Sequence, residues 1–432
     1  MKWALKKLLY ILVITAITLV ITEFSLRFIL FSDIPGFENL RDPSLYAKVY
    51  NDRGDLMFSD DYWKLYHRFR NEYSPPDTCH PELGWVGDFE RKSLKHYHAH
   101  KVGKRRAVLL YGDSFAQCVN AQCFQEHLNS DSAFSEQHYL LNYGVGGYGV
   151  GQIYSLFRKT ATSFEKPFVV FSIMTHDLDR TVLSNRIGPK PYYEEINGQL
   201  IKKGIPVETD PDAFYNDNPP SILSYLYRLF LSRFVPQKRV SAEETCQFKK
   251  KIARTNQLLL EQTIGELKSL DTDYLVLIFN PLSSGKHDWR HLWLRRFLNN
   301  EGVPHLFTID IMEQDAYEGG DYALYEQPEN GHPTTYQVSL ISEVLKKAVM
   351  DSSYLNQLQR GNILKLKQYE FEFSHEGQVE LQTDIIKQDS VWLEHLQAKA
   401  LQTDRPLDEI LREDAEYTVS EMHRHECEIP SP

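Results

Sequence analysis

The longest uninterrupted apolar pattern in the chain lies near its N-terminus. Three lysines among the first seven residues precede an uncharged stretch from Leu8 to Thr22, and apolar residues continue as far as Phe31. A membrane-spanning helix needs about 17–25 residues. The run reaches this length only with its last part, where Glu23 and Arg27 lie one helical turn apart and can pair. The lysines favour a cytoplasmic N-terminus, with everything after the run outside the cytoplasm.

Two other interpretations of this run exist. A cleaved signal peptide would need a small-x-small cleavage site, and none follows the run, which favours an uncleaved anchor. A buried helix of a soluble protein is the second alternative, and the lysines before the run count against it. We therefore predict a single-pass membrane anchor over residues 1–32, with the body in the periplasm or outside the cell.

Four shorter apolar runs indicate buried parallel strands, because each is continuous rather than alternating. Helix-like stretches lie between and after them, including 249–270 and 334–349. Strands that alternate with helices favour a parallel sheet covered by helices on both faces. We therefore predict an α/β fold, a three-layer α/β/α sandwich, with strands at Arg106–Tyr111, Tyr139–Asn142, Phe168–Met174 and Asp273–Phe279.

The remaining segments divide the chain into parts. Residues 33–105 are aromatic and polar and form an N-terminal extension, and residues 106–350 form the sandwich. An insertion at about 181–248 contains Asn197-Gly198 between two strand-like runs, a strong hairpin signal, and a helix-like stretch at 221–234. We expect the insertion to lie over the carboxyl edge of the sheet and to shape a substrate pocket. Residues 351–432 form a C-terminal helical segment, with two short helices at 390–401 and 406–415 packed as a hairpin.

Composition narrows the possible partners. Acidic side chains number 59 against 48 basic ones, which gives a net charge of -11. Such a body repels phosphate backbones, so we expect no nucleic-acid partner. The five cysteines form no zinc-binding pattern. Cys118 and Cys123 are close enough to bridge in an oxidising compartment, and isolated buried thiols are an equally good interpretation.

Three sequence blocks carry candidate chemistry. Ser114 follows the first predicted strand and would stand at the carboxyl edge of the sheet, where open α/β folds bind ligands. A glycine-rich segment around Gly147 follows the second strand and lets a backbone amide approach a reacting carbonyl oxygen. His332 precedes a predicted helix, beside Glu329 and Asn330, where it can act as a general base. Taken alone, the serine block is more often a turn and the histidine is more often structural or on the surface, whereas a flexible loop is the less favoured interpretation of the glycine block.

Together, these blocks resemble the SGNH/GDSL hydrolase family in their order and spacing. The resemblance covers roughly residues 75–350 and implies a flavodoxin-like sandwich. It also implies that Ser114 is the nucleophile, that His332 is its base, and that the amides of Ser114 and Gly147 line an oxyanion hole. The segments His80–Trp85 and Asn142–Gln152, with the Lys-Pro-Tyr-Tyr at 190–193, look like exported bacterial members that accompany surface-polysaccharide clusters.

The chain departs from the family pattern at two places. His176 occupies the position where the family supplies an Asn to the oxyanion hole; a histidine can still donate a hydrogen bond in the right tautomer or when protonated. The family also has an Asp two or three residues before the histidine, where this chain has Asn330 and Glu329. We expect Glu329 to orient His332, because Asn330 cannot supply a negative charge.

The resemblance implies an esterase that removes short acyl groups, such as acetyl, from a glycan or another small ester by a Ser-His mechanism. No metal or organic cofactor is needed for this chemistry. Two alternatives remain: an O-acyltransferase acting on a surface polysaccharide through the same residues, and a catalytically inactive protein that binds glycans or assists their assembly.

Overall fold

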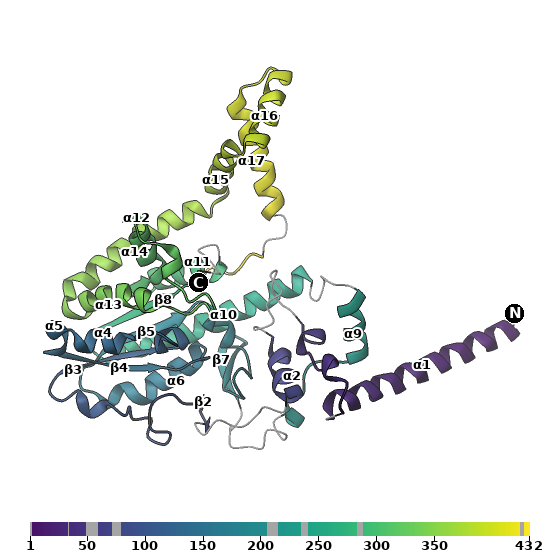
Figure 1. Cartoon of the computed structure of the whole chain (residues 1–432), viewed down its shortest axis with the longest axis horizontal. Helices are drawn as coiled ribbons and strands as arrows, with labels where there is room; N and C mark the ends of the chain where they lie inside the picture. The colour runs from purple at the N-terminus through teal and green to yellow at the C-terminus, as the bar shows by residue number, and fades with distance from the viewer. Residues whose placement is uncertain are drawn as a thin grey trace.

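A five-stranded sheet forms the centre of the molecule (Figure 1), in the order β4-β3-β5-β8-β9. The computed structural model describes residues 2–32, 34–48, 59–70, 79–204, 215–234, 241–282, 288–423 and 427–432. Every neighbouring pair of strands in this sheet is parallel. The strands are β3 (Arg106–Gly112), β4 (His138–Gly144), β5 (Phe168–Met174), β8 (Tyr274–Phe279) and β9 (His305–Phe307).

The strand order reverses at β3. The chain passes from β3 to β4 on one side and then crosses to the other side, where β5, β8 and β9 follow in sequence. This is the flavodoxin-like doubly wound order, and ligands in such folds bind outside the carboxyl ends of the strands at the reversal point. A ligand site is therefore expected at the carboxyl ends of β3 and β5.

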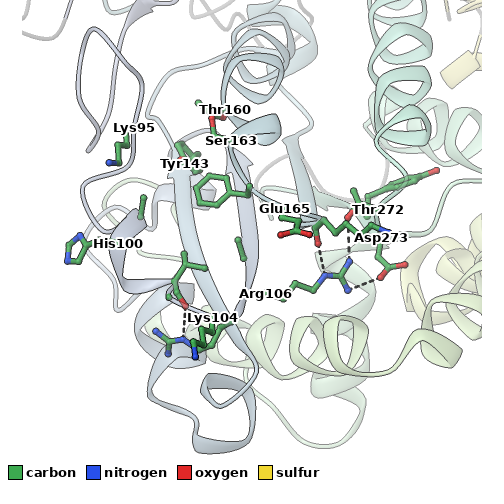
Figure 2. A pocket seen from close by; sticks show the side chains of 18 of the residues that line it. Lys95, His100, Lys104, Arg106, Tyr143, Thr160, Ser163, Glu165, Thr272 and Asp273 are labelled. Carbon is green, nitrogen blue, oxygen red and sulfur yellow. Dashed lines mark hydrogen bonds and ion pairs between the residues drawn. The ribbon is translucent and has the colours of Figure 1, made fainter.

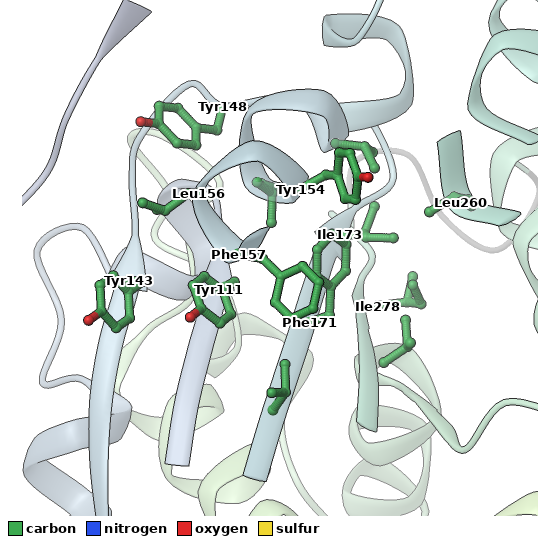
Figure 3. Close-up of a cluster of buried hydrophobic side chains, with 14 of the residues drawn as sticks. Tyr111, Tyr143, Tyr148, Tyr154, Leu156, Phe157, Phe171, Ile173, Leu260 and Ile278 are labelled. Carbon is green, nitrogen blue, oxygen red and sulfur yellow. The ribbon is translucent and has the colours of Figure 1, made fainter. Parts of the chain in front are cut away.

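Helices cover both faces of the sheet, and alternate residues of each strand pack on opposite faces. In β3, Leu109 and Tyr111 join one hydrophobic cluster, while Val108 and Leu110 join the other. Figure 3 shows Tyr111 beside Tyr143 and Phe157 in the first cluster. Because both faces are buried, the strand sequences are continuously apolar rather than alternating.

The predicted α/β sandwich is thus confirmed, and each of the four predicted strands is present. The fifth strand, β9, was not predicted. The helices, in chain order, are α1 (Lys2–Phe31), α2 (Asp60–Arg70), α3 (Ser114–Gln117), α4 (Phe124–Ser130), α5 (Ser132–Ser135), α6 (Val150–Thr160), α7 (Asp177–Arg180), α9 (Tyr225–Phe234), α10 (Ala242–Ser269), α11 (Trp289–Asn300), α12 (Thr308–Tyr317), α13 (Thr335–Met350), α14 (Ser352–Glu372), α15 (His375–Gln388), α16 (Ser390–Thr403) and α17 (Leu407–His423).

The predicted insertion contains the expected hairpin, but its position differs from the expectation. Strands β6 (Tyr192–Ile196) and β7 (Gln199–Lys203) pair antiparallel around Asn197-Gly198. The hairpin contacts α10, and the ring of Tyr193 packs against α6 at Gly151. The hairpin itself therefore packs on these helices, whereas Ile187 of the same insertion reaches Gly147 beside the carboxyl edge, so the expected role of the insertion in shaping a pocket stays a prediction. A further short pair, β1 (Cys79–His80) with β2 (Gly84–Trp85), belongs to the N-terminal extension.

The C-terminal segment is helical, as predicted, but it contains four helices rather than two. Helices α16 and α17 contact each other as expected, and α15 packs on both. Figure 1 shows these three helices projecting from the sandwich. The chain end returns to the body, where Cys427 forms a disulfide with Cys246 of α10 and the indole of Trp293 donates to the carbonyl of Pro430 (3.2 Å).

A second disulfide joins Cys118 and Cys123, so the bridge is present rather than two isolated thiols. The side chain of the fifth cysteine, Cys79, lies outside the described residues. Within α1, the 27 residues Leu5–Phe31 have a mean hydropathy of 2.1, and their most apolar stretch is not buried against the rest of the chain, whereas Leu26 and Leu30 near the end of the helix are buried. This length and composition suit a membrane span, and they also suit a signal sequence.

Candidate active site

Ser114 stands at the carboxyl end of β3, as the first residue of α3. The preceding residue, Asp113, caps this helix by accepting a hydrogen bond from the amide of Phe115 (2.9 Å). A β-carbon at Gly112 would lie 2.0 Å from the hydroxyl of Ser172 on β5. Only glycine therefore allows β3 and β5 to approach this closely at position 112. Because Ser114 closely follows β3, it lies where the strand order reverses.

His332 reaches Ser114 from the loop before α13. Its Nε2 lies 2.9 Å from Oγ of Ser114, and its ring packs on Phe115 with centroids 5.3 Å apart. The loop is held against the segment that follows Ser114 by Gln327, whose side-chain amide donates to the carbonyl of Val119 (2.7 Å). Residues 218 positions apart in the sequence are thus placed at hydrogen-bonding distance.

The hydrogen bonds of Asn330 determine the tautomer of His332. One atom, Oδ1 of Asn330, faces both the backbone N–H of His332 (2.9 Å) and ring Nδ1 (3.1 Å). The backbone N–H can only donate, so the atom that it meets must be the amide oxygen. Nδ1 must therefore carry the proton and donate to the same oxygen. Nε2 is left with its lone pair and can accept the hydroxyl proton of Ser114.

Glu329 does not occupy the position that we expected for it. Its side chain is exposed, and Nδ1 of His332 is met by Asn330 instead. The reason is a tight turn, in which the amides of Asn330 (3.3 Å) and Gly331 (2.8 Å) both donate to the carbonyl of Gln327. The turn directs Asn330 back toward the ring and Glu329 outward to solvent.

The surroundings of His332 favour its neutral form. Burial lowers the pKa of His332 below its ordinary value of 6.5; Asp113 opposes this shift, and Arg180 adds to it. A neutral imidazole at neutral pH is the form that can accept a proton.

The backbone amides of Ser114 and Gly147, which are expected from the sequence to line an oxyanion hole, have no hydrogen-bond acceptor among the described residues. As the first residue of α3, Ser114 has an amide with no carbonyl one turn earlier in the helix to accept from it. Gly147 has a φ of +77°, and across the described ranges its amide donates no hydrogen bond. The amide of the neighbouring Gly146, by contrast, donates to the side chain of Gln117 (2.8 Å). The two amides that the sequence suggested therefore have no competing acceptor.

His176 follows β5 at the same edge of the sheet. Its Nε2 lies 3.6 Å from a carboxylate oxygen of Asp288. Asp288 also pairs with Arg290 (2.9 Å), which in turn binds Asp179. This network places the ring of His176 beside a carboxylate, and its expected contribution to an oxyanion hole stays a prediction.

A buried charge cluster beside Ser114 was not predicted from the sequence. The guanidinium of Arg180 binds Asp113 (2.8 Å) and Asp177 (2.7 Å) with the same nitrogen. Burial, and then repulsion from Asp113, raises the pKa of Asp177, while Arg180 opposes the shift. Asp113 also lies 3.4 Å from the hydroxyl of Ser114. The cluster therefore fixes the strand ends that carry the nucleophile.

A large cleft of about 1530 Å³ lies at the opposite, amino ends of the strands. Arg106 at the start of β3 forms an ion pair there with Asp273 (2.8 Å), as Figure 2 shows. This cleft is far from the carboxyl edge and takes no part in the site.

Within the described ranges, no group of three or more His, Cys, Asp or Glu side chains could hold a metal ion.

No known family model matches the chain, and a search of curated proteins also finds no match. Among solved structures, the acetylxylan esterase Axe2 from Geobacillus stearothermophilus matches with a TM-score of 0.32 and 12% identity, over 58% of this chain and 96% of that one. LAE5, an alpha/beta hydrolase enzyme from the metagenome of Lake Arreo, matches with a TM-score of 0.31 and 12% identity, over 57% of this chain and 96% of that one. Likeness at this level says nothing about activity, which has to be argued from the site itself.

Proposed function

We propose that the chain is a serine esterase, and the observation that carries this proposal is the 2.9 Å contact between Oγ of Ser114 and Nε2 of His332. The hydrogen bonds of Asn330 leave Nε2 unprotonated, so the serine hydroxyl is the donor in this contact. A serine in this arrangement can be activated for attack on a carbonyl carbon.

The proposed reaction proceeds in two steps. Oγ of Ser114 attacks the ester carbonyl while Nε2 of His332 takes its proton, and the amides of Ser114 and Gly147 stabilise the negative oxygen. The carbon–oxygen bond of the ester then breaks, and His332 donates its proton to the departing alcohol. Water, activated by His332 in the same way, releases the acid and restores Ser114.

The replacement of the usual triad carboxylate by Asn330 makes this machinery weaker rather than inoperative. Asn330 supplies the hydrogen bond that sets the tautomer, but it adds no negative charge to stabilise the imidazolium that forms during attack. We therefore infer a slow esterase, with short acyl esters such as acetyl groups on a glycan as the substrate class. The net charge of -11 is compatible with such a neutral substrate.

We also propose that residues 1–32 anchor the protein in a membrane, with the body on the extracytoplasmic side. The exposed apolar surface of α1 supports the anchor. The disulfides Cys118–Cys123 and Cys246–Cys427 support an oxidising compartment for the body. The division into an extension at 33–105, a sandwich at 106–350 and a helical segment at 351–432 belongs to the same proposal.

Two observations favour the inactive alternative, a binding or assembly protein. No carboxylate meets Nδ1 of His332 among the described side chains, and the ring of His176 lies beside Asp288. Transfer of the acyl group to a sugar hydroxyl, instead of water, would use the same residues as hydrolysis.

A chromogenic acetate ester separates the active interpretations from the inactive one. The full-length protein in detergent should release the chromophore, and Ser114→Ala should reduce the release at least about 10³-fold. Ser339→Ala is a matched control and should retain the rate, because Ser339 is half-buried on α13 and its hydroxyl bonds only to the carbonyl of Tyr336 in the same helix. Equal rates for Ser114→Ala and the natural protein would reject the esterase proposal.

A further inference from the structure

Helix α9 carries apolar side chains on two of its sides. On its inner side, Tyr225 joins Leu26 and Leu30 of α1 in a small hydrophobic cluster. Its outer stripe consists of Tyr227, Phe230 and Phe234, spaced three and four residues apart along the helix, together with Leu223, which lies two residues before the helix begins. The stripe is exposed throughout: Leu223 is 98% exposed, Tyr227 61%, Phe230 54% and Phe234 70%.

The N-terminus of α9 is fastened to α1. The carboxylate of Glu23 accepts hydrogen bonds from the amides of Tyr225 (3.0 Å) and Leu226 (2.9 Å). These are amides that a helix cannot satisfy internally. Arg27 binds Glu23 (2.7 Å) and also donates to the carbonyl of Leu223 (2.8 Å). Figure 1 shows α9 beside the C-terminal part of α1 and at an angle to it.

This attachment point has a defined depth if α1 spans a bilayer. Between Lys7 and Glu23, α1 rises by about 24 Å, at 1.5 Å per residue. The long side chain of Lys7 extends this distance toward the roughly 30 Å of a hydrocarbon core. Glu23, Arg27 and the start of α9 therefore lie at the boundary between lipid tails and headgroups on the far side.

We propose that α9 lies on the extracytoplasmic surface of the bilayer that α1 spans, with its outer stripe in contact with lipid. This inference rests on the proposed membrane anchor. Tyrosine and phenylalanine side chains suit the interfacial region. Arg228 and Arg233 lie on the same helix and can pair with lipid phosphates. Lipid is the occupant that we favour over a second protein copy, because the stripe begins where α1 leaves the bilayer.

An environment-sensitive fluorophore on single introduced cysteines tests this proposal in the full chain. The background carries Cys79→Ala, so that the introduced thiol is the only cysteine outside the two disulfides. The protein is reconstituted into phosphatidylcholine–phosphatidylglycerol vesicles, with and without brominated lipids. Tyr227→Cys and Phe230→Cys report on the stripe, Val13→Cys reports on α1, and Tyr417→Cys on α17 is the exposed control (67% exposed).

We expect blue-shifted emission at positions 227 and 230 that brominated lipids quench, and emission at 417 that resembles water and is not quenched. Quenching at 13 with no quenching at 227 and 230 would overturn the proposal while leaving the anchor intact. A blue shift at 230 that ignores brominated lipid and disappears on dilution would identify a second protein copy as the occupant instead. No quenching at 13 would refute the anchor, and the surface proposal with it, while leaving the esterase assay unaffected.

Discussion

Asn330 accepts two hydrogen bonds from His332 through a single oxygen, one from the backbone N–H (2.9 Å) and one from ring Nδ1 (3.1 Å). The same amide donates through its nitrogen to Gln327 (3.1 Å), so its orientation is fixed on both sides. The position that would hold a carboxylate in a Ser-His-Asp triad thus holds a neutral acceptor that still selects the useful tautomer.

The first prediction concerns this neutral acceptor. Asn330→Asp adds a charge that stabilises the imidazolium formed during attack, so it should raise kcat on a chromogenic acetate ester by about 10- to 100-fold. Asn330→Ala removes the acceptor and should lower kcat. Glu329→Gln should change the rate less than about twofold, because the Glu329 side chain is exposed. A larger loss from Glu329→Gln than from Asn330→Ala would contradict the geometry described here.

The second prediction concerns pH. Because burial lowers the pKa of His332 below 6.5, the base stays unprotonated as the pH falls through the ordinary histidine range. The kcat/KM profile should therefore be flat around neutral pH and should decline only at a pH below 6.5. A decline centred at or above 6.5 would show that the base is another group or that His332 is more solvated than the structure indicates.

A third prediction concerns Glu326, which forms an isolated antiparallel β-bridge with Pro333, the residue after His332. Burial raises the pKa of Glu326 to about 7, although the amide of Leu282 opposes the shift. A raised folded-state pKa stabilises the protein fully below the unfolded value and loses that stabilisation as the pH rises through about 7. As the pH rises from about 5 to about 8, the Tm of the natural protein should fall, and Glu326→Gln should make this fall smaller because glutamine cannot ionise. If the variant and the natural protein show the same dependence of Tm on pH, ionisation of Glu326 does not contribute to stability in this range.

The fourth prediction uses two glycines with nearly the same backbone conformation. Gly147 has a φ of +77° and Gly198 one of +76°, but a β-carbon at Gly147 would lie 2.7 Å from Ile187, whereas one at Gly198 would meet nothing within 4 Å. Either change to alanine should cost about 1–2 kcal/mol of stability for the left-handed backbone. Only Gly147→Ala should also lower kcat/KM, by about tenfold or more, because it moves an oxyanion amide. Equal activity of the two variants would exclude Gly147 from the site.

Local patterns in the sequence were sufficient to predict most strands of the sheet. The four predicted strands are each continuous apolar runs, and Asn197-Gly198 is a short-range turn signal. Strand β9 was missed because His305–Phe307 contains only three residues, too few to form a pattern. The helices α14 and α15 were missed because much of their surface is exposed, which weakens the apolar periodicity.

The site was predictable only in part. Ser114 and His332 could be named because their neighbouring residues match a known arrangement. The role of Asn330 could not, because it depends on the turn at Gly331, where φ is +68°. The pairing of Arg180 at the end of α7 with Asp113 before α3 joins residues 67 positions apart, and no local sequence pattern predicts such a contact.

Covalent labelling tests the central claim most directly. Full-length protein is incubated with a serine-directed fluorophosphonate probe, and the modified peptide is identified by mass spectrometry. We predict a single adduct on Ser114, which is lost in Ser114→Ala and strongly slowed in His332→Ala, because the serine then has no base. Alanine at position 114 keeps the backbone amide, so the loss would report the hydroxyl rather than the fold. Undiminished labelling of Ser114→Ala, or no labelling of the natural protein, would contradict the assignment of Ser114 as the nucleophile.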